Sequence, residues 1–350
     1  MASTAISSDN PVVIKHWDEM EFREVNKEMY IQKFMGKSSD SLIFEKTKLL
    51  KDQGDKITFT IFPRQAAQVV KGSSGQSLEG KEGTIKSFTD YVNLEEYKMA
   101  FKWNEGLDSQ RPWFTISEQA AKGLAQVSAE TLDDLWFAEM QGISDDPLAP
   151  SHKIYGGGKG SIAALDANSK LTPQLIRRCK ALANSGFANG SNARRTYPFQ
   201  PVKVNGKNYL IFLTHDYAVY DLQNNAEYQG YIKEAERRGP ENPIFTGAVA
   251  IINNVIIHTH ENMQILPHPS TPGLYYCTSL LLGAGSSIWA WGKRPETVKK
   301  EFGYKEAYGL GRKFIAKAKK TQFKFTASGS KEDYGSAMVY VTVTNVAEAE

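Results

Sequence analysis

The chain has 350 residues, and its 42 Lys and Arg residues against 39 Asp and Glu residues give a formal net charge of +3. A chain of this length can bury a sizeable hydrophobic core in about one to three domains. Its hydrophobic content of 41% excludes an intrinsically disordered protein. The near balance of charge argues against a dedicated nucleic-acid binder, because such proteins usually carry a strong basic excess.

Cysteine content and apolar runs exclude two further classes. Cys179 and Cys277 are too few for a secreted disulfide scaffold, and they lack the CxxC spacing of a zinc site. Met1–Pro11 has no basic segment followed by an apolar run, so it does not have the pattern of a signal peptide. No apolar run approaches the roughly 20 residues that a membrane-spanning helix needs. We expect a soluble protein with reduced thiols and no membrane partner.

The first part of the chain predicts extended elements. Residues 1–50 have little to bury among themselves, so we expect an arm that packs on the rest of the chain or on another subunit. Lys56–Phe62 alternates apolar and polar residues, which predicts a strand. A polar, glycine-containing excursion over Pro63–Thr84 separates it from a second strand-like run, Ile85–Trp103. This pattern predicts a long β-hairpin that must lie on another surface, because it is not stable alone in water.

The strongest helix is predicted over about residues 116–141. Thr115 and Glu118 have the spacing of a capping box. Apolar residues then recur every three or four positions up to a stop at Gly142. Such a helix would be about 39 Å long, which is longer than average and suggests the backbone of a domain.

The rest of the chain mixes helices and strands, so we expect an α+β fold. Thr172–Ala183 predicts a helix with Pro173 at its first position and Gly186 as its stop. Two hairpin turns are predicted at Asn205-Gly206 and Asn253-Asn254. Met338–Thr344 predicts a final strand.

Signals for catalysis are weak. His258 and His260 would share one face of a strand and could bind a metal, but no second ligand cluster accompanies them. A metal-dependent hydrolase using these two residues is therefore the enzyme alternative, and ordinary polar strand residues are the simpler interpretation. We expect no enzyme activity and no cofactor.

A basic window is the main feature of charge. Residues 293–324 contain 11 Lys and Arg and three Glu, a net charge of +8, which leaves −5 for the rest of the chain. Two interpretations stay open: a solvated face, or an electrostatic contact with a neighbouring subunit or with packaged nucleic acid. The candidate basic patch consists of Lys293, Arg294, Arg312, Lys313, Lys317, Lys319 and Lys320.

The order of these parts resembles the major capsid proteins of tailed bacteriophages, which have the Hong Kong 97-like fold, and more narrowly the phage N-four type. The resemblance covers about residues 30–345. The segments that carry it are Phe34–Ser41, Gly54–Phe59, Leu78–Gly80, Val204–Lys207, Asn242–Ala248, Val255–His258, Lys320–Phe323 and Asp333–Gly335.

The resemblance implies a Hong Kong 97-like division of the chain into an N-terminal arm, an E-loop, a P-domain with a spine helix, and an A-domain. The implied boundaries are 1–50 for the N-terminal arm, 51–103 for the E-loop hairpin, 104–201 for the P-domain with its spine helix at about 116–141, 202–305 for the A-domain, and 306–350 for return strands of the P-domain.

The resemblance also implies a structural function. We expect a subunit that self-assembles into hexamers and pentamers of an icosahedral head enclosing double-stranded DNA, which would be assembled in the host cytoplasm and retained in the virion. A tail-tube or decoration protein is the structural alternative. Portal, scaffolding and decoration or cement proteins are possible partners, and DNA contact would be non-specific. The implied contact residues are Arg64, Lys71, Gly72, Gly75, Glu79, Gly80, Lys81 and Glu82 in the E-loop, and Trp17, Phe22, Phe34 and Met35 in the arm.

Overall fold

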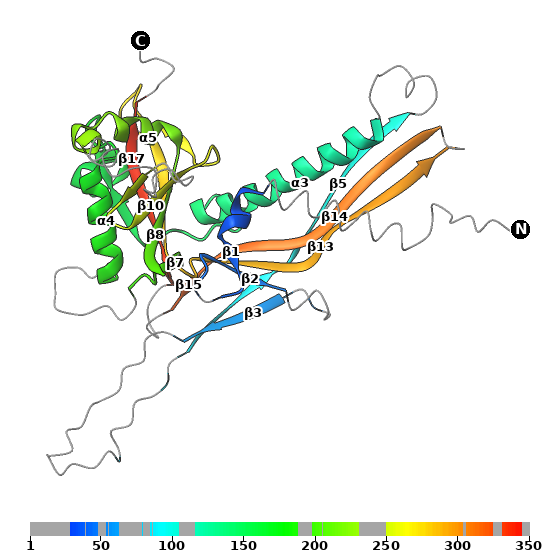
Figure 1. Ribbon diagram of the computed structural model, residues 1–350, viewed down its shortest axis with the longest axis horizontal. Helices are drawn as coiled ribbons and strands as arrows, with labels where there is room; N and C mark the ends of the chain where they lie inside the picture. Colours follow the sequence, from blue (N-terminus) through cyan, green and yellow to red (C-terminus); the bar gives the residue numbers. More distant parts are fainter. Residues whose placement is uncertain are drawn as a thin grey trace, which may run out of the picture.

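The computed structural model describes residues 29–38, 40–47, 54, 56–62, 79, 85, 87–104, 116–187, 198–204, 206–230, 250–303, 306–324 and 331–344. Two large sheets and one long helix form the body, from which a pair of strands projects (Figure 1). The helices are η1 (Tyr30–Phe34), α3 (Ile116–Gln141), η4 (Gly156–Gly158), η5 (Ile162–Ala164), α4 (Pro173–Ser185) and α5 (Asp216–Gln223), and the described residues 226–230 are also helical.

A five-stranded sheet forms an arm with α3 lying along it (Figure 1). Its strand order is β1 (Met35–Gly36), β2 (Ile43–Lys46), β13 (Ser287–Phe302), β14 (Ala307–Lys320) and β5 (Glu95–Asn104). Buried and partly exposed residues alternate along most of β14, because one side of the strand faces α3. In β13 the register shifts twice between Trp291 and Glu296, and Pro295 lies within this irregular stretch. Proline is tolerated there because a bulged strand does not need every amide in the ladder.

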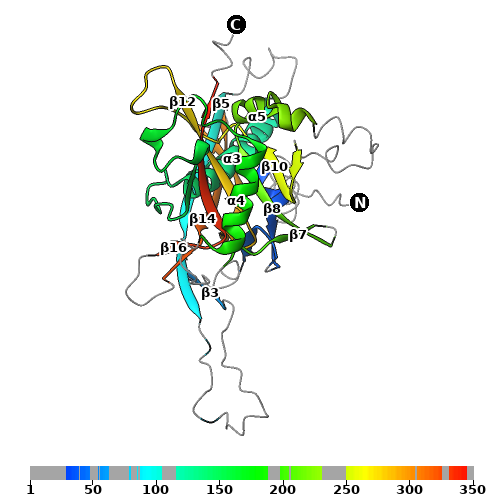
Figure 2. The same cartoon turned by 90° about the vertical axis from the view of Figure 1, so that its left-hand side faces the viewer.

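An eight-stranded sheet forms the second layer. Its main path is β6 (Lys153–Tyr155), β17 (Ser336–Val343), β12 (Tyr275–Leu282), β8 (Lys207–Thr214), β10 (Val255–Thr259) and β9 (Ala250–Ile252). β7 (Val202–Val204) pairs with β8, and β11 (Ile265–Pro267) pairs with β12. Every residue of β17 is buried, since α4 and α5 cover one face of the sheet and the C-terminal half of α3 meets the other (Figures 1 and 2).

Two pairs of strands lie outside these sheets. β3 (Lys56–Ile61) and β4 (Phe88–Asn93) form an antiparallel hairpin, and β15 (Gln322–Phe323) pairs with β16 (Glu332–Asp333). The hairpin projects below the arm, and its base packs on the five-stranded sheet (Figure 1).

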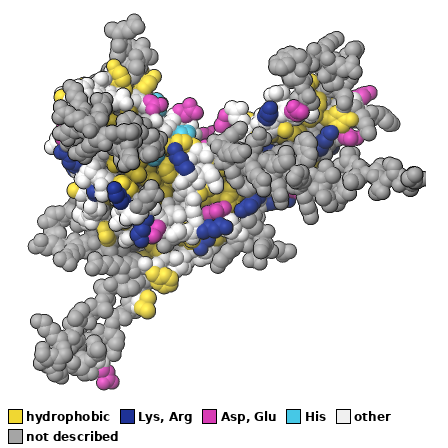
Figure 3. Space-filling model, in the orientation of Figure 1, with side chains coloured by type: hydrophobic (Ala, Val, Ile, Leu, Met, Phe, Trp, Pro, Cys, Tyr) yellow, Lys and Arg dark blue, Asp and Glu magenta, His cyan; other side chains and the backbone are white. Residues whose placement is uncertain are grey.

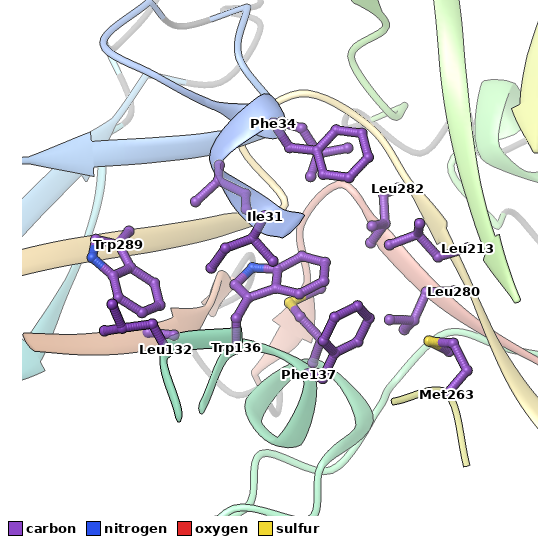
Figure 4. Close-up of a cluster of buried hydrophobic side chains, with 14 of the residues drawn as sticks. Ile31, Phe34, Leu132, Trp136, Phe137, Leu213, Met263, Leu280, Leu282 and Trp289 are labelled. Atoms are coloured by element: carbon purple, nitrogen blue, oxygen red, sulfur yellow. The ribbon is translucent and has the colours of Figure 1, made fainter. Parts of the chain in front are cut away.

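One apolar core joins both large sheets. Figure 4 shows Leu132, Trp136 and Phe137 of α3 among side chains from both sheets. Trp289 belongs to the five-stranded sheet and Leu280 to the eight-stranded sheet. The indole nitrogen of Trp136 donates a hydrogen bond to Ser287 Oγ over 2.8 Å, which satisfies the polar atom of a fully buried ring. The core therefore fixes the orientation of the two sheets relative to each other.

Several predicted elements are confirmed. α3 has the predicted bounds, although Thr115 of the expected capping box lies outside the described residues. α4 begins after Thr172, whose hydroxyl accepts a hydrogen bond from the Leu175 amide, and it ends at Gly186 with a left-handed φ of 63°. The hairpins β7–β8 and β9–β10 and the strand β17 also lie where the sequence predicts them.

The pairing of strands corrects two expectations. The single strand expected over Ile85–Trp103 is divided at Leu94, and only β4 belongs to the hairpin, because β5 pairs with β14 in the arm. The expected boundary at residue 305 also does not separate the sheets. β13, which precedes it, pairs with β14, whereas β17, which follows it, lies in the sheet of β8 and β12. Periodicity alone does not show which strand a segment pairs with.

We predict that Trp136→Ala lowers the free energy of unfolding by about 3–5 kcal/mol, because it leaves a large cavity between the two sheets. Val127→Ala removes a partly exposed side chain from the same helix and should cost less than about 1 kcal/mol. Urea unfolding of the unassembled subunit, followed by circular dichroism, measures both. Equal losses for the two variants would contradict the shared core.

Candidate assembly surfaces

The β3–β4 hairpin has one anchored face. Its register runs from Lys56 opposite Asn93 to Ile61 opposite Phe88. The inward side chains of Ile57, Phe59 and Val92 are buried in a small core with Ile288, Ala290 and Phe323, and the Phe59 and Phe323 rings meet edge to face at 5.9 Å. This core lies at the base of the hairpin, so the base is attached to the body of the same chain.

The outer end of the hairpin exposes apolar side chains. Phe62 follows β3 and is 70% exposed, and Ile85 precedes β4 and is 75% exposed. Large apolar side chains this open to solvent are candidates for contact with another chain. Among the expected E-loop contact residues, Glu79 is described and exposed. The others lie outside the described residues: Arg64, Lys71, Gly72, Gly75, Gly80, Lys81 and Glu82.

The first described residues are bound to their own chain. The carboxylate of Asp133 on α3 accepts hydrogen bonds from the backbone amides of Tyr30 (2.8 Å) and Ile31 (3.1 Å). The Tyr30 hydroxyl donates to the carbonyl oxygen of Thr259 at the end of β10 over 3.2 Å. Burial raises the pKa of Asp133 to about 6, and the two amide donors partly oppose that rise. Residues 29–34, which we call the clasp, therefore connect α3 to the eight-stranded sheet.

Two of the expected arm contacts belong to the core of the subunit. Phe34 is buried, and its ring meets that of His258 at 5.4 Å. Met35 is half-buried and packs against the same core. Figure 4 shows the position of its neighbour Phe34. Phe34 packs within its own subunit because α3 and β10 supply an intramolecular surface that the sequence does not reveal. Its contact with another subunit stays a prediction. Trp17 and Phe22 lie outside the described residues.

The basic window does not form one exposed patch. β13 and β14 pair with each other, and most of the candidate cations form ion pairs with carboxylates of the same chain. Arg312 is buried under α3, where it donates to Thr297 Oγ1 and Ser128 Oγ. Arg294 lies exposed on β13. The ion pairs are Lys293 and Lys313 with Glu296, Lys317 with Glu95, Lys319 with Asp90, and Lys320 with Asp333.

Lys320 and Asp333 form a buried ion pair with N–O 3.1 Å, where the chain leaves the five-stranded sheet. Their side chains are 1% and 0% exposed. Asp333 also accepts hydrogen bonds from the Ser151 amide (2.7 Å) and from Gln322 Nε2 (2.7 Å). Burial lowers the pKa of Lys320, and Asp333 opposes that effect. The pair holds the connection between the two sheets and is not available to an outside partner.

Comparison with known proteins gives consistent matches. The sequence model of the family described as "Phage capsid protein" matches residues 5–181 and 188–346. This chain therefore belongs to the phage capsid protein family. A curated relative, the "Major capsid protein" of Pseudomonas phage KPP25, is 24% identical over 93% of this chain and 94% of its own length.

The solved structures that resemble this capsid protein are also phage capsids. The capsid of Ralstonia phage GP4 matches with a TM-score of 0.78 and 22% identity, over 99% of both chains. The capsid of Cyanophage Pam1 matches with a TM-score of 0.72 and 16% identity, over 99% of this chain and 100% of the other. The expected Hong Kong 97-like fold is confirmed. A subunit of this family is part of the virion and assembles in many copies.

The two histidines considered as metal ligands, His258 and His260, pack against aromatic side chains in this capsid protein. His260 stacks on Phe137 at 4.5 Å and meets Tyr30 at 4.2 Å, and its Nδ1 accepts the Asn262 amide. Burial lowers the pKa of His258 to about 4. Within the described part of the chain, no group of three or more His, Cys, Asp and Glu residues is placed to hold a metal ion, and no helix is long and apolar enough to cross a membrane.

We predict that His258→Gln reduces the loss of stability in acid. The unfolded histidine takes up a proton near pH 6.5 and the folded one only near pH 4, so the wild-type protein loses stability as pH falls between these values. The free energy of unfolding of the unassembled subunit, measured in urea at pH 7 and pH 5, should therefore fall less in the variant.

Asp133→Asn serves as the control with opposite sign. The folded Asp133 takes up its proton near pH 6, before the unfolded one near pH 3.8, so this residue adds stability as pH falls. Removing it should make the loss of stability in acid steeper. If both variants lose the same stability as the wild type between pH 7 and pH 5, the buried positions of these two groups are contradicted.

We predict that Lys320→Met lowers the free energy of unfolding by about 3–5 kcal/mol, because it leaves the buried Asp333 carboxylate without its cation. Lys313→Met removes a lysine of the same strand whose ion pair is exposed, and it should cost less than about 1 kcal/mol. Urea unfolding measures both variants, and a small loss for Lys320→Met would show that the pair is hydrated.

Proposed function

We propose that this chain is the major subunit of the icosahedral head of a tailed phage, in which its copies form hexamers and pentamers around double-stranded DNA. The match of the phage capsid family to almost the whole chain carries the proposal. The name of the Pseudomonas phage KPP25 relative, "Major capsid protein", supports the assignment to the major subunit. The same matches favour this function over a tail tube, a decoration protein or a metal-dependent hydrolase.

The shape of the subunit supports self-assembly. A hairpin and a long arm project from the part of the molecule that α4 and α5 cover (Figure 1). Figure 3 shows hydrophobic side chains where the described part of the projecting hairpin ends and near the far end of the arm. Projections of this kind add area for contact with neighbours, and many interfaces of ordinary size acting together can hold a shell.

The proposed domains keep the expected division into an N-terminal arm, an E-loop, a P-domain and an A-domain, but their boundaries follow the observed strand pairing. The E-loop is the β3–β4 hairpin with the residues between its strands, and it ends near Leu94 because β5 belongs to the arm. We assign α3 and the five-stranded sheet to the P-domain. The eight-stranded sheet with α4 and α5 supplies the A-domain, and residues before the clasp supply the N-terminal arm.

Contacts with neighbouring subunits are proposed for the E-loop and for the start of the arm. The E-loop residues are Arg64, Lys71, Gly72, Gly75, Glu79, Gly80, Lys81 and Glu82, and the arm residues are Trp17 and Phe22. Glycines at the tip would let one sequence bend differently in hexamers and pentamers.

Other partners and the place of assembly follow from the proposed role. The head would contain a portal, would assemble on a scaffolding protein in the host cytoplasm, and could carry a decoration protein. The subunit would act without catalysis or a cofactor. We do not assign DNA contact to the basic window, since five of its cations are paired with carboxylates of the same chain.

We predict that deleting residues 72–83 leaves a folded subunit that cannot form closed shells, because the deletion shortens the E-loop and leaves the β3–β4 pairing in place. Electron microscopy of the purified protein should show regular particles, tens of nanometres wide, for the wild type and none for the deletion. Circular dichroism should give the same unfolding midpoint for both.

Ser73→Ala with Ser74→Ala provides a matched control within the same segment and should form shells. Normal shells from the deletion variant would contradict the E-loop assignment. Absence of shells from the wild-type protein, under conditions in which the subunit is folded, would contradict the proposed function itself.

A further inference from the structure

The arm has a long strand at its edge. At the ends of the two large sheets, β1, β6 and β9 have two or three residues each, whereas β5 has ten. Short edge strands protect a sheet from pairing with other chains, and a long one is a template for such pairing. β5 runs along the arm beside β14 (Figure 1), and no strand among the described residues pairs with its other side.

Two of the usual devices that disfavour edge pairing, proline and a β-bulge, are missing from β5. It contains no proline or glycine, and its register with β14 runs without a bulge from Glu95 opposite Ala316 to Asn104 opposite Ala307. α3 does not pair with this edge, because it packs on one face of the sheet, where its Ser128 contacts Arg312 of β14 and Met99 of β5. Most residues of β5 are exposed, including Phe101 at 43%.

Charges on β5 are arranged in two halves. Glu95 and Glu96 begin the strand, and Lys98 and Lys102 follow. The carboxylate of Glu96 pairs with Lys98 over 2.8 Å, and both side chains are exposed. The Lys102 ammonium lies 4.9 Å from the centre of the Phe302 ring. Exposed contacts of this kind are weak and can be exchanged for better ones at an interface.

We propose that β5 pairs antiparallel with β5 of a second copy across a two-fold axis, with Glu96 opposite Lys102 of that copy. This inference rests on the proposed function, because it describes how two subunits meet within a shell. Side chains of directly opposite residues lie on the same face, so the register places Met99 opposite its own copy and Tyr97 opposite Phe101. The two arms then form one continuous ten-stranded sheet.

Charge selects this register over its neighbours. Shifting the pairing by two residues in one direction places Lys98 opposite Lys98 of the second copy, and shifting it in the other direction places Lys98 opposite Lys102. Both place like charges directly opposite each other, which destabilises a strand pair. The proposed register instead forms two Glu–Lys pairs and two aromatic pairs, and it covers the exposed ring of Phe101.

Disulfide trapping tests the register directly. Opposite residues of an antiparallel pair have Cα atoms about 4.5–5.5 Å apart, within the range of a disulfide. Glu96→Cys combined with Lys102→Cys should therefore give disulfide-linked dimers in assembled shells on a non-reducing gel. Each single variant should stay monomeric. The native Cys179 and Cys277 are buried and do not interfere.

The form of the product identifies the partner. A two-fold pairing closes after two subunits, so dimers should be the limit. A head-to-tail contact between β5 strands would instead link more than two subunits and give a ladder of larger products. Pairing of β5 with a different segment would leave the engineered cysteines without a partner and give no crosslink. A dimer from Lys98→Cys alone would indicate a shifted register. A ladder, a Lys98→Cys dimer, or shells of the double variant without any crosslink would each overturn the proposal.

A charge swap provides an independent measurement. Glu96→Lys and Lys102→Glu should each reduce the yield of shells several-fold, and the two together should restore it, because the opposite charges then face each other again. A double variant no better than the poorer single variant would overturn the pairing. If wild-type protein forms shells while these tests fail, the proposed function stands and only the β5 contact is lost. If wild-type protein forms no shells, the proposed function fails first.

Discussion

The arrangement of the subunit depends on the buried stripe of α3, because this one helix contributes to a core shared by both large sheets. Leu132 and Trp136 lie fully buried among residues of the arm and of the eight-stranded sheet. Apolar burial has no preferred direction by itself, but interlocking side chains on both sides of a helix leave few ways to arrange the layers. The direction in which the arm projects is thus a property of core packing.

Polar side chains of α3 fix the details of that packing. The carboxylate of Asp133 accepts hydrogen bonds from two backbone amides of the clasp. The side chain of Gln141 accepts a hydrogen bond from the Gln264 amide and donates one to the carbonyl oxygen of Asn262. Buried polar groups are costly unless they are satisfied, so each of these contacts favours one placement of the loops around the helix. The buried Lys320–Asp333 pair likewise favours one placement of the chain where it leaves the five-stranded sheet.

The sequence predicted local elements well and their partners poorly. The bounds of α3, the ends of α4 at Thr172 and Gly186, and the Asn253-Asn254 turn follow from spacing, capping and turn chemistry, which act over a few residues. The separation of β4 from β5 at Leu94 depends on which strand each one meets, and that information lies more than 200 residues away, in β14.

The candidate surfaces show the same contrast between local patterns, which the sequence reveals, and distant partners, which it does not. A count of Lys and Arg over residues 293–324 found the charge of the window but not the carboxylates of Glu95, Asp90 and Asp333, which come from other elements and pair with it. In the sequence, Phe34 looked available for contact with another subunit, because the surfaces that bury it belong to the distant elements α3 and β10. Burial of this kind is a property of tertiary structure, and no local pattern in the sequence carries it.

The position of β17 has a consequence for the biosynthesis of the subunit. This strand lies between β6 and β12 within the eight-stranded sheet, and its residues 338–340 pair with residues 153–155. Pairings so distant along the chain form slowly, because a long loop must close before they contribute. While a ribosome is still synthesising residues 336–343, the sheet lacks an inner strand and the core beneath α4 is open. Folding of this layer therefore waits until β17 has been synthesised.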